Sequence, residues 1–483
     1  MSTIKEVSKG IFWIGAAKYS GILISLIITA ILARRISPSA FGTIAVAIVI
    51  LQFLNILADI GIGTAIVQFK QLTKKNYNDI FSITLVIGLL LGILLYHSSG
   101  LISDYYSNDS LKNVCQYMSI VIFFNSLDIV PNGLMRKDKR FKAIAIRTLS
   151  FRIASGTVAV WGAFHGWNIY ALLVSPIMTS IGVFSVNFYN YPQRITLNIS
   201  KESIIVIFSY SFYQFLFSFM NYFSRNLDKL MIGRAFSMEQ LGFYDKAYHL
   251  MMLPVQNISY IIDPVLHPVL SDLQDKKEDL MKKNERLVSY ISMLSFPIGL
   301  LLFFCGGEIV KIVYGDRWDS AIPVFRILAL SLPLQIILST INPIFLSAGQ
   351  TKAMFYSGVL NTFITVSGMV AAIIYYPTIE SVGWAWDITL VINFVNSYLI
   401  LYKYVFKNSP NMFFKALLPQ LFNSILTFII CVIAFTAVQV GNLFISFILK
   451  SIIILLCTLL FASWLKQYQL RELLSFLIKR IKK

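Results

Sequence analysis

Seven basic residues are candidates for binding, because they lie inside or at the edges of long apolar stretches, where a charged side chain is costly and by default marks a binding site or a pathway. They are Lys18, Arg147, Arg152, Arg225, Lys229, Lys246 and Arg326. The guanidinium group of Arg binds phosphate through two parallel hydrogen bonds, and the ammonium group of Lys acts as a point charge. These residue types therefore predict a cationic track that binds an anionic head group.

A structural interpretation competes with this one for the charges between residues 225 and 246. Arg225, Lys229 and Lys246 could extend to the membrane surface or pair with Asp228 and Asp245. Both interpretations stay open at the level of the sequence.

Carboxylates in the apolar stretches offer a second kind of chemistry, the binding of a proton or a sodium ion that drives transport. The candidates for ion coupling are Asp59, Asp128 and Asp228, and further carboxylates are Asp263, Glu308 and Asp387. A structural ion pair is the alternative for each. The four cysteines and four histidines show no paired spacing, so we expect no metal site, no disulfide and no bound cofactor.

The elements that carry these residues are long apolar segments. Of the 483 residues 57% are hydrophobic and only 13% are charged, against about 25% charged residues in soluble domains. Uninterrupted runs of about 20 apolar residues indicate membrane helices rather than barrel strands. The composition predicts an all-α polytopic membrane protein with about 14 spans, at residues 11–33, 41–66, 79–101, 112–133, 143–165, 167–189, 204–233, 241–266, 287–313, 322–347, 353–375, 382–402, 415–438 and 443–465.

The net charge of +18 is distributed between the spans, which argues against nucleic acid as a partner. Most Lys and Arg residues fall in the loops on the side of the N-terminus, so the positive-inside rule predicts cytoplasmic N- and C-termini. Residues 466–483 combine leucines and isoleucines at helical spacing with six basic residues, which predicts an amphipathic helix on the membrane surface.

An internal repeat organises the spans. Residues 31–47 and 231–247 align without a gap and share Arg34/Arg234, Ser37/Ser237, Gly42/Gly242 and Ala47/Ala247. The repeat predicts two parallel six-helix bundles around a central cavity, with a substrate site near the bilayer midplane between them. The expected domains are 1–195, 196–410, two extra spans at 411–465, and the terminal helix at 466–483.

Three motifs resemble those of bacterial polysaccharide exporters: ILARRISPSAFG at 31–42, ADIGIG at 58–63, and NLDK, IGR and LGFY between 226 and 244. The sequence is similar to Wzx-type flippases of the lipopolysaccharide and colanic-acid export group, in the multidrug/oligosaccharidyl-lipid/polysaccharide (MOP) exporter superfamily. The resemblance implies a twelve-span core with two extra helices in the bacterial cytoplasmic (inner) membrane. It also implies oligosaccharides linked to undecaprenyl diphosphate as substrates, moved by alternating access for surface polysaccharide biosynthesis, with other assembly proteins as partners.

Two other functions compete with export. A membrane glycosyltransferase or polymerase would need a large outer loop with paired catalytic acids, and the predicted outer loops are short. A multidrug or cation antiporter of the same superfamily would favour a cavity rich in carboxylates, whereas the charges here are mostly basic. We therefore expect a transporter that has no catalytic residues and is not an enzyme.

Overall fold

The computed structural model describes residues 2–198, 200, 215, 219, 222–223, 225–271, 276–437 and 440–464. These residues form helices and no strands, as predicted. Within them, 12 helices are long and apolar enough to cross a membrane, and they correspond to 12 of the predicted spans. Of the other two, 204–233 falls largely outside the described residues and 241–266 lies in a helix. The predicted amphipathic helix at 466–483 lies outside the described residues.

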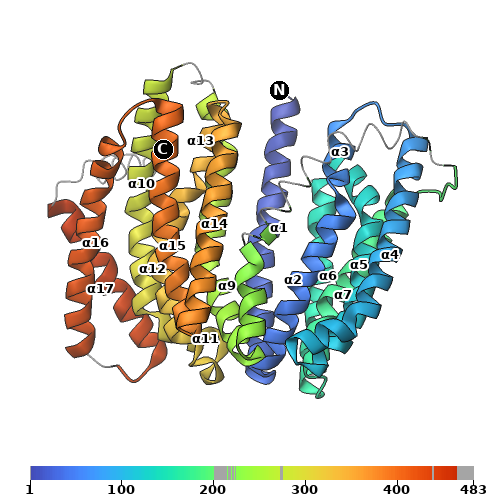
Figure 1. The fold of residues 1–483 in the computed structure, drawn as a ribbon, viewed down its shortest axis with the longest axis horizontal. Coiled ribbons are helices and arrows are strands. Elements are labelled where there is room, and N and C mark those ends of the chain that lie inside the picture. The colour runs from blue at the N-terminus through green and yellow to red at the C-terminus, as the bar shows by residue number, and fades with distance from the viewer. Residues whose placement is uncertain are drawn as a thin grey trace. The chain divides into compact units, whose positions relative to one another are not determined.

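The chain divides into two compact units, Met1–Gly242 and Phe243–Lys483. Figure 1 shows their helices. The first unit contains α1 (Ser2–Arg35), α2 (Pro38–Asp59), α3 (Ile62–Gln68), α4 (Lys74–Tyr106), α5 (Asp109–Lys137), α6 (Phe141–Phe164) and α7 (Ile169–Asn190). Helix α5 is central in this unit, because it packs on α2, α3, α4 and α7. The predicted domain boundaries remain a prediction.

The predicted span 41–66 is interrupted, because α2 ends at Asp59. Ile60 and Gly61 both adopt left-handed backbone conformations, with φ of 41° and 80°, and α3 then starts at Ile62. The Asp59 carboxylate accepts a hydrogen bond from the backbone N–H of Gly63 at 2.8 Å. Apolar patterning missed this break because residues 60–66 are themselves mostly apolar.

The repeat has a structural counterpart at the starts of α2 and of α9 (Met238–Ser271). Ser37 caps α2 by accepting a hydrogen bond from Ala40 N, and Ser237 accepts one from Gln240 N at 3.2 Å. Serine at this position satisfies a backbone donor that the helix leaves unpaired. The matching serines therefore begin equivalent helices.

The repeated glycines lie where two backbones meet. A Cβ atom at Gly42 would overlap the Met238 carbonyl oxygen, and one at Gly242 would overlap the carbonyl oxygen of Pro38. Small residues allow such close packing in membranes. The contact explains glycine at both equivalent positions.

The segment after α7 is anchored to the start of α4. Thr196 Oγ1 donates to the Asp79 carboxylate at 2.9 Å, and Ser200 donates to it from both N and Oγ at 3.2 and 3.1 Å. Asp79 is fully buried, so these bonds compensate for the loss of water. At the start of the segment the Tyr191 hydroxyl donates to Asp138, and burial together with this bond raises the pKa of Tyr191 to about 12.

After α9, the second unit continues with α10 (Lys277–Phe304), α11 (Gly306–Tyr314), the 3-10 helix η1 (Asp316–Trp318), α12 (Ala321–Ser339), α13 (Ile341–Ser347), α14 (Thr351–Tyr375), α15 (Ile379–Ile400), the π-helix η2 (Leu401–Phe406), α16 (Asn411–Ala437) and α17 (Leu443–Trp464). Helix α12 packs on α10 and α15, and α16 and α17 pack on α10. The predicted span 287–313 divides at Cys305 into α10 and α11.

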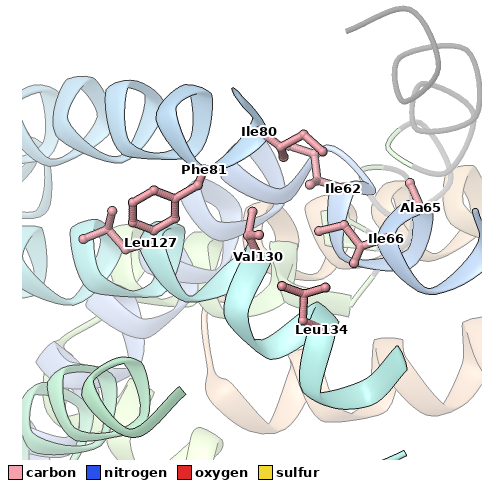
Figure 2. Packing of buried hydrophobic residues seen from close by; sticks show 8 residues of the cluster. All are labelled: Ile62, Ala65, Ile66, Ile80, Phe81, Leu127, Val130 and Leu134. Carbon is pink, nitrogen blue, oxygen red and sulfur yellow. The ribbon is translucent and has the colours of Figure 1, made fainter. Parts of the chain in front are cut away.

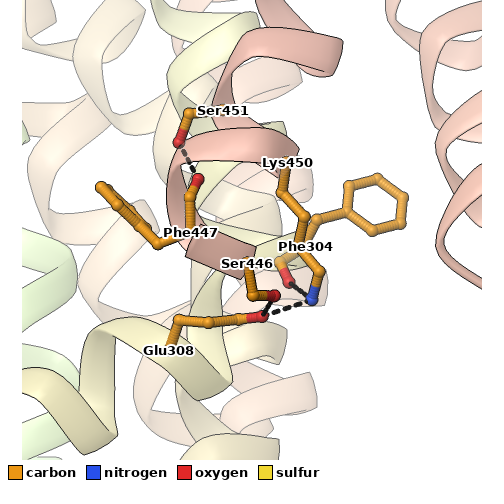
Figure 3. Close-up of polar contacts among 6 residues, drawn as sticks. All are labelled: Phe304, Glu308, Ser446, Phe447, Lys450 and Ser451. Carbon is orange, nitrogen blue, oxygen red and sulfur yellow. Dashed lines mark hydrogen bonds and ion pairs between the residues drawn. The ribbon is translucent and has the colours of Figure 1, made fainter. Parts of the chain in front are cut away.

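The last helix is fixed to α11 by a charged cluster (Figure 3). Lys450 Nζ and Ser446 Oγ both donate to Glu308 Oε1 at 2.6 Å. Lys450 also donates to the Phe304 carbonyl oxygen at 3.4 Å. Glu308, one of the carboxylates considered for ion coupling, thus makes a structural ion pair.

The close approach at Gly42 gives a test of the fold. Gly42→Ala should lower the yield of folded protein and its thermal unfolding midpoint, because the added methyl group must displace backbone atoms. Gly100→Ala is the matched control, since a Cβ there meets nothing within 4 Å and alanine is favoured over glycine in a helix by about 1 kcal/mol. Fluorescence-detected size exclusion after heating measures both. Equal midpoints for the two variants would contradict the packing argument.

Candidate functional site

A polar cavity of about 360 Å³ opens in the first unit between α2, α3 and α5. Two predicted ion-coupling residues, Asp59 of α2 and Asp128 of α5, both line it. The structure thus brings together two carboxylates that are far apart in the sequence.

Helical spacing explains how the cavity wall is built. Asn125, Asp128, Asn132 and Arg136 recur every three or four residues and so share one face of α5. Asn55 lies one turn before Asp59 on α2 and accepts a hydrogen bond from Asn125 Nδ2 at 3.1 Å. The two polar faces meet at the cavity.

The cavity wall combines apolar residues with carboxylate and amide oxygens. Asn132 Oδ1 is buried and has no hydrogen-bond partner among the described residues. Carboxylate and amide oxygens suit hard cations, and carboxylates also bind protons. The guanidinium of Arg136 introduces the opposite charge, and this side chain is exposed.

An apolar cluster holds α3 in place behind the cavity (Figure 2). Its buried members are Ile62, Ala65, Ile66, Ile80, Phe81, Leu127, Val130 and Leu134, contributed by α3, α4 and α5. A Cβ at Gly133 would lie 3.1 Å from Ile66 Cγ2, so glycine permits α3 to approach α5. The cluster fixes the short helix although α3 has only 7 residues.

Arg147 is joined to the cavity through an amide. Its Nη1 donates to Asn187 Oδ1, and Asn187 Nδ2 donates to Asp128 Oδ1 at 2.7 Å. Asn187 is fully buried and Arg147 is 9% exposed. A chain of two hydrogen bonds therefore connects the predicted phosphate-binding Arg147 to the predicted ion-coupling Asp128.

Lys18 and Arg152 lie on neighbouring helices that pack together, α1 and α6. The guanidinium of Arg152 lies against Gly21, and Lys18 precedes that glycine by less than one turn. Both basic side chains are half-buried. Lys18 and Arg152, both members of the predicted cationic track, thus lie on neighbouring helices.

The charged residues just before the second repeat segment share one short helical stretch. Arg225 is exposed and Lys229, one turn later, is half-buried. Asp228 is buried, and its Oδ1 accepts a hydrogen bond from the backbone N–H of Lys229 at 2.8 Å. The Asp228 carboxylate is thus hydrogen-bonded to the backbone of the next residue in the chain.

The remaining two predicted cations belong to the second unit. Lys246 Nζ lies 3.1 Å from Asp245 Oδ2, and these side chains are 15% and 13% exposed. This ion pair matches the structural interpretation considered for Lys246. Arg326 on α12 is exposed, and its Cγ would lie 3.0 Å from a Cβ at Gly306.

Three residues that line the cavity or bond to one of its residues were not singled out from the sequence: Asn132, Arg136 and Asn187. Arg136 lies beyond the predicted span 112–133, and α5 extends one residue beyond Arg136. The signal that could have found Asn132 and Arg136 is their helical spacing from Asp128. No local pattern marks Asn187, because its role depends on two other helices.

Comparison with known proteins identifies the family. The profile of a family described as "Polysaccharide biosynthesis protein" matches residues 31–323. The chain belongs to this family. It is 24% identical to the lipopolysaccharide biosynthesis protein WzxC of Escherichia coli K12 over 443 residues, covering 89% of this chain and 88% of WzxC. It is 23% identical to the teichuronic acid biosynthesis protein TuaB of Bacillus subtilis 168, with 86% of each chain covered.

The fold matches that of a solved flippase. The lipid II flippase MurJ in an inward closed conformation superposes with a TM-score of 0.74 at 16% identity, covering 93% of this chain and 98% of MurJ. The predicted helical fold is therefore confirmed. The family match confirms the predicted resemblance to polysaccharide biosynthesis proteins. This chain, with 12 helices long and apolar enough to cross a membrane among its described residues, is a multi-pass membrane protein.

The hydrogen bonds of Asn187 give a test of the site. Asn187→Leu should lower the free energy of unfolding by roughly 3 kcal/mol, because it leaves Arg147 and Asp128 buried without their common partner. Asn190→Leu, one turn further along α7 at an exposed position, is the control and should change stability little. Thermal unfolding of the purified variants measures the difference. A midpoint for Asn187→Leu equal to that of the control would exclude a stabilising role.

Proposed function

We propose that this protein is a flippase that moves undecaprenyl-diphosphate-linked oligosaccharides across the bacterial cytoplasmic membrane for surface polysaccharide biosynthesis. Family membership carries the proposal, because the profile covers most of the first unit and extends into the second. The names of WzxC and TuaB associate these relatives with lipopolysaccharide and teichuronic acid biosynthesis. In this proposal both termini are cytoplasmic, and other membrane proteins of polysaccharide assembly are partners.

The diphosphate of the substrate is the chemical target of the cations. Lys18 and Arg152 are our first choice, since they lie on adjacent helices and neither is fully buried. Arg147, Arg225, Lys229, Lys246 and Arg326 complete the proposed track. A phosphate oxygen between an Arg fork and a Lys ammonium would form charge-assisted hydrogen bonds.

The cavity supplies a separate function in this proposal, the binding of the coupling ion. Asp59 and Asp128 contribute carboxylates to one space, and Asn132 adds an amide oxygen without a partner among the described residues. A proton or a sodium ion bound there would be linked through Asn187 to Arg147. Asp228 is the third candidate, at a buried position.

Replacement of the cations tests substrate binding. Arg152→Ala and Lys18→Ala should each reduce export by roughly tenfold or more at equal protein levels, because each removes a charge-assisted hydrogen bond to phosphate. Arg152→Lys should retain part of the activity, since it keeps the charge and loses the fork. The measurement is the accumulation of lipid-linked intermediates in the inner leaflet of cells that carry each variant.

The control for these variants is Lys112→Ala, which removes an exposed lysine of α5. It should leave export unchanged. Full export by both Lys18→Ala and Arg152→Ala would exclude the cationic track. Accumulation of a soluble cation in place of a lipid-linked sugar in a deletion strain would favour an antiporter.

Asp59 offers a test that separates its charge from its hydrogen bond. The amide oxygen of Asn can accept the same hydrogen bond, so Asp59→Asn should keep the contact to Gly63 N and the fold while removing the charge. We expect the response of transport to pH or sodium gradients to be lost in Asp59→Asn. Asp59→Ala should in addition lower the unfolding midpoint. An unchanged response to both gradients in Asp59→Asn would exclude Asp59 from ion coupling.

A further inference from the structure

Asp387 is a buried carboxyl group in the second unit that none of the roles above uses. It lies on α15, two turns after Ile379, and is only 7% exposed. Neither of its oxygens has a hydrogen-bond partner in the part of the chain that the structure describes. An ionised carboxylate buried in this way would carry a desolvation cost that no hydrogen bond offsets.

The neighbour of this carboxyl group is the hydroxyl of Ser331 on α12, a helix that packs against α15. Ser331 Oγ already donates its hydrogen to the Leu328 carbonyl oxygen at 2.7 Å. It also accepts a hydrogen bond from Gln335 Nε2 at 3.0 Å. A hydroxyl has one hydrogen and two lone pairs, so Ser331 can offer Asp387 a lone pair and nothing else.

This hydrogen-bond direction decides between the two forms of the carboxyl group. A carboxylate only accepts hydrogen bonds, whereas a protonated carboxyl can donate one. A protonated Asp387 can therefore donate a hydrogen bond to Ser331 while Ser331 keeps its bond to Leu328.

The charges on the packed helices do not supply a counter-ion. Among the described residues no ion pair includes Asp387. The charged residue of α12 is Arg326, more than one turn before Ser331 and exposed, and that of α14 is Lys352, in its first turn and exposed. On α15 itself the other acidic residue is Glu380, in the first turn.

Helix α9 approaches the same region through an aromatic contact. Tyr248 packs edge-on against Trp386, with 5.5 Å between ring centroids. The titratable groups of α9 near that contact are His249 and the pair Asp245 and Lys246, whose charges neutralise each other at 3.1 Å. Among the described residues, the polar group beside Asp387 on α12 is thus the Ser331 hydroxyl, and the preceding residue of α15, Trp386, contacts α9.

We propose that Asp387 is an intramembrane proton-binding site of the second unit, with Ser331 as the acceptor of its hydrogen bond. The carboxylate takes a proton from water when a conformational change opens the α12–α15 contact, and the new O–H bond donates to Ser331 when the helices close. Release reverses both steps, and no other reactant is needed. The role in transport rests on the proposed flippase function, while the binding of the proton does not.

Infrared spectroscopy tests proton binding directly on the purified full-length protein in lipid nanodiscs. The difference spectrum between neutral and strongly alkaline samples should contain the carbonyl band of a protonated carboxyl group. Asp387→Asn should lower the intensity of this band by the contribution of one carboxyl group, over any contribution from Asp59 and Asp128, and Ser331→Ala should shift that contribution by removing the hydrogen-bond acceptor. A band that is absent from the unmodified protein, or whose intensity is unchanged in Asp387→Asn, would overturn the proposal.

Asp79→Asn is the matched control. Asp79 is also buried, but its carboxylate accepts three hydrogen bonds from Thr196 and Ser200 and so suits the ionised form. The band should survive this substitution. If Asp387→Asn does not fold, the shift in Ser331→Ala decides, because an unshifted band would exclude Asp387 as its source.

Transport assays in proteoliposomes then test the coupling. Asp387→Asn mimics the protonated form, so transport should lose its dependence on a pH gradient, and Asp387→Glu should recover part of it. An Asp387→Asn protein with the pH dependence of the unmodified one would exclude coupling through this site. If the infrared band behaves as expected but the unmodified protein does not move lipid-linked oligosaccharide, only the proposed function fails.

Discussion

The pairing of charged groups away from water is the constraint on which this structure depends. Asp128 and Arg147 are buried on different helices, and the amide of Asn187 on a third helix bonds to both. Asp79 binds the segment after α7, and Glu308 binds α17 through Lys450. A buried charge without a partner would destabilise the fold. The helices that carry these groups and their partners must therefore pack so that each pair stays in contact.

Glycine provides the complementary constraint, the close approach of backbones. The contact of Gly42 and Gly242 with the opposite helix starts leaves no space for a side chain. Serine caps at residues 37 and 237 begin the same two helices. The identities found in the repeat therefore mark architecture. Arg225 and Lys229 lie before the repeated segment, where the residues 200 positions earlier are the uncharged Ser25 and Thr29, and they remain candidates for substrate binding.

The cavity and the buried Asp387 show two different ways to hold a carboxyl group among helices. Asp59 and Asp128 keep hydrogen bonds from Gly63 and Asn187, and a cavity lies beside them. Asp387 has a neighbour that can only accept a hydrogen bond. The first arrangement suits an ion that enters from a cavity, and the second suits a proton held between two helices. A flippase driven by an ion gradient would have use for either.

The sequence by itself determined the helical class, the approximate spans and the family, because apolar runs, cap residues and motifs are local properties of the chain. It also found Asp59, Asp128 and the basic residues as candidates, since charge in an apolar run is visible without a structure. The sequence did not reveal the break at Ile60, because nothing in an apolar stretch shows that one of its residues adopts a left-handed conformation. Only the tertiary structure decided which side chains meet, as in the link from Arg147 through Asn187 to Asp128 or the contact of Asp387 with Ser331. Such contacts depend on how each helix is rotated and tilted against its neighbours, and that geometry is set by packing over the whole unit.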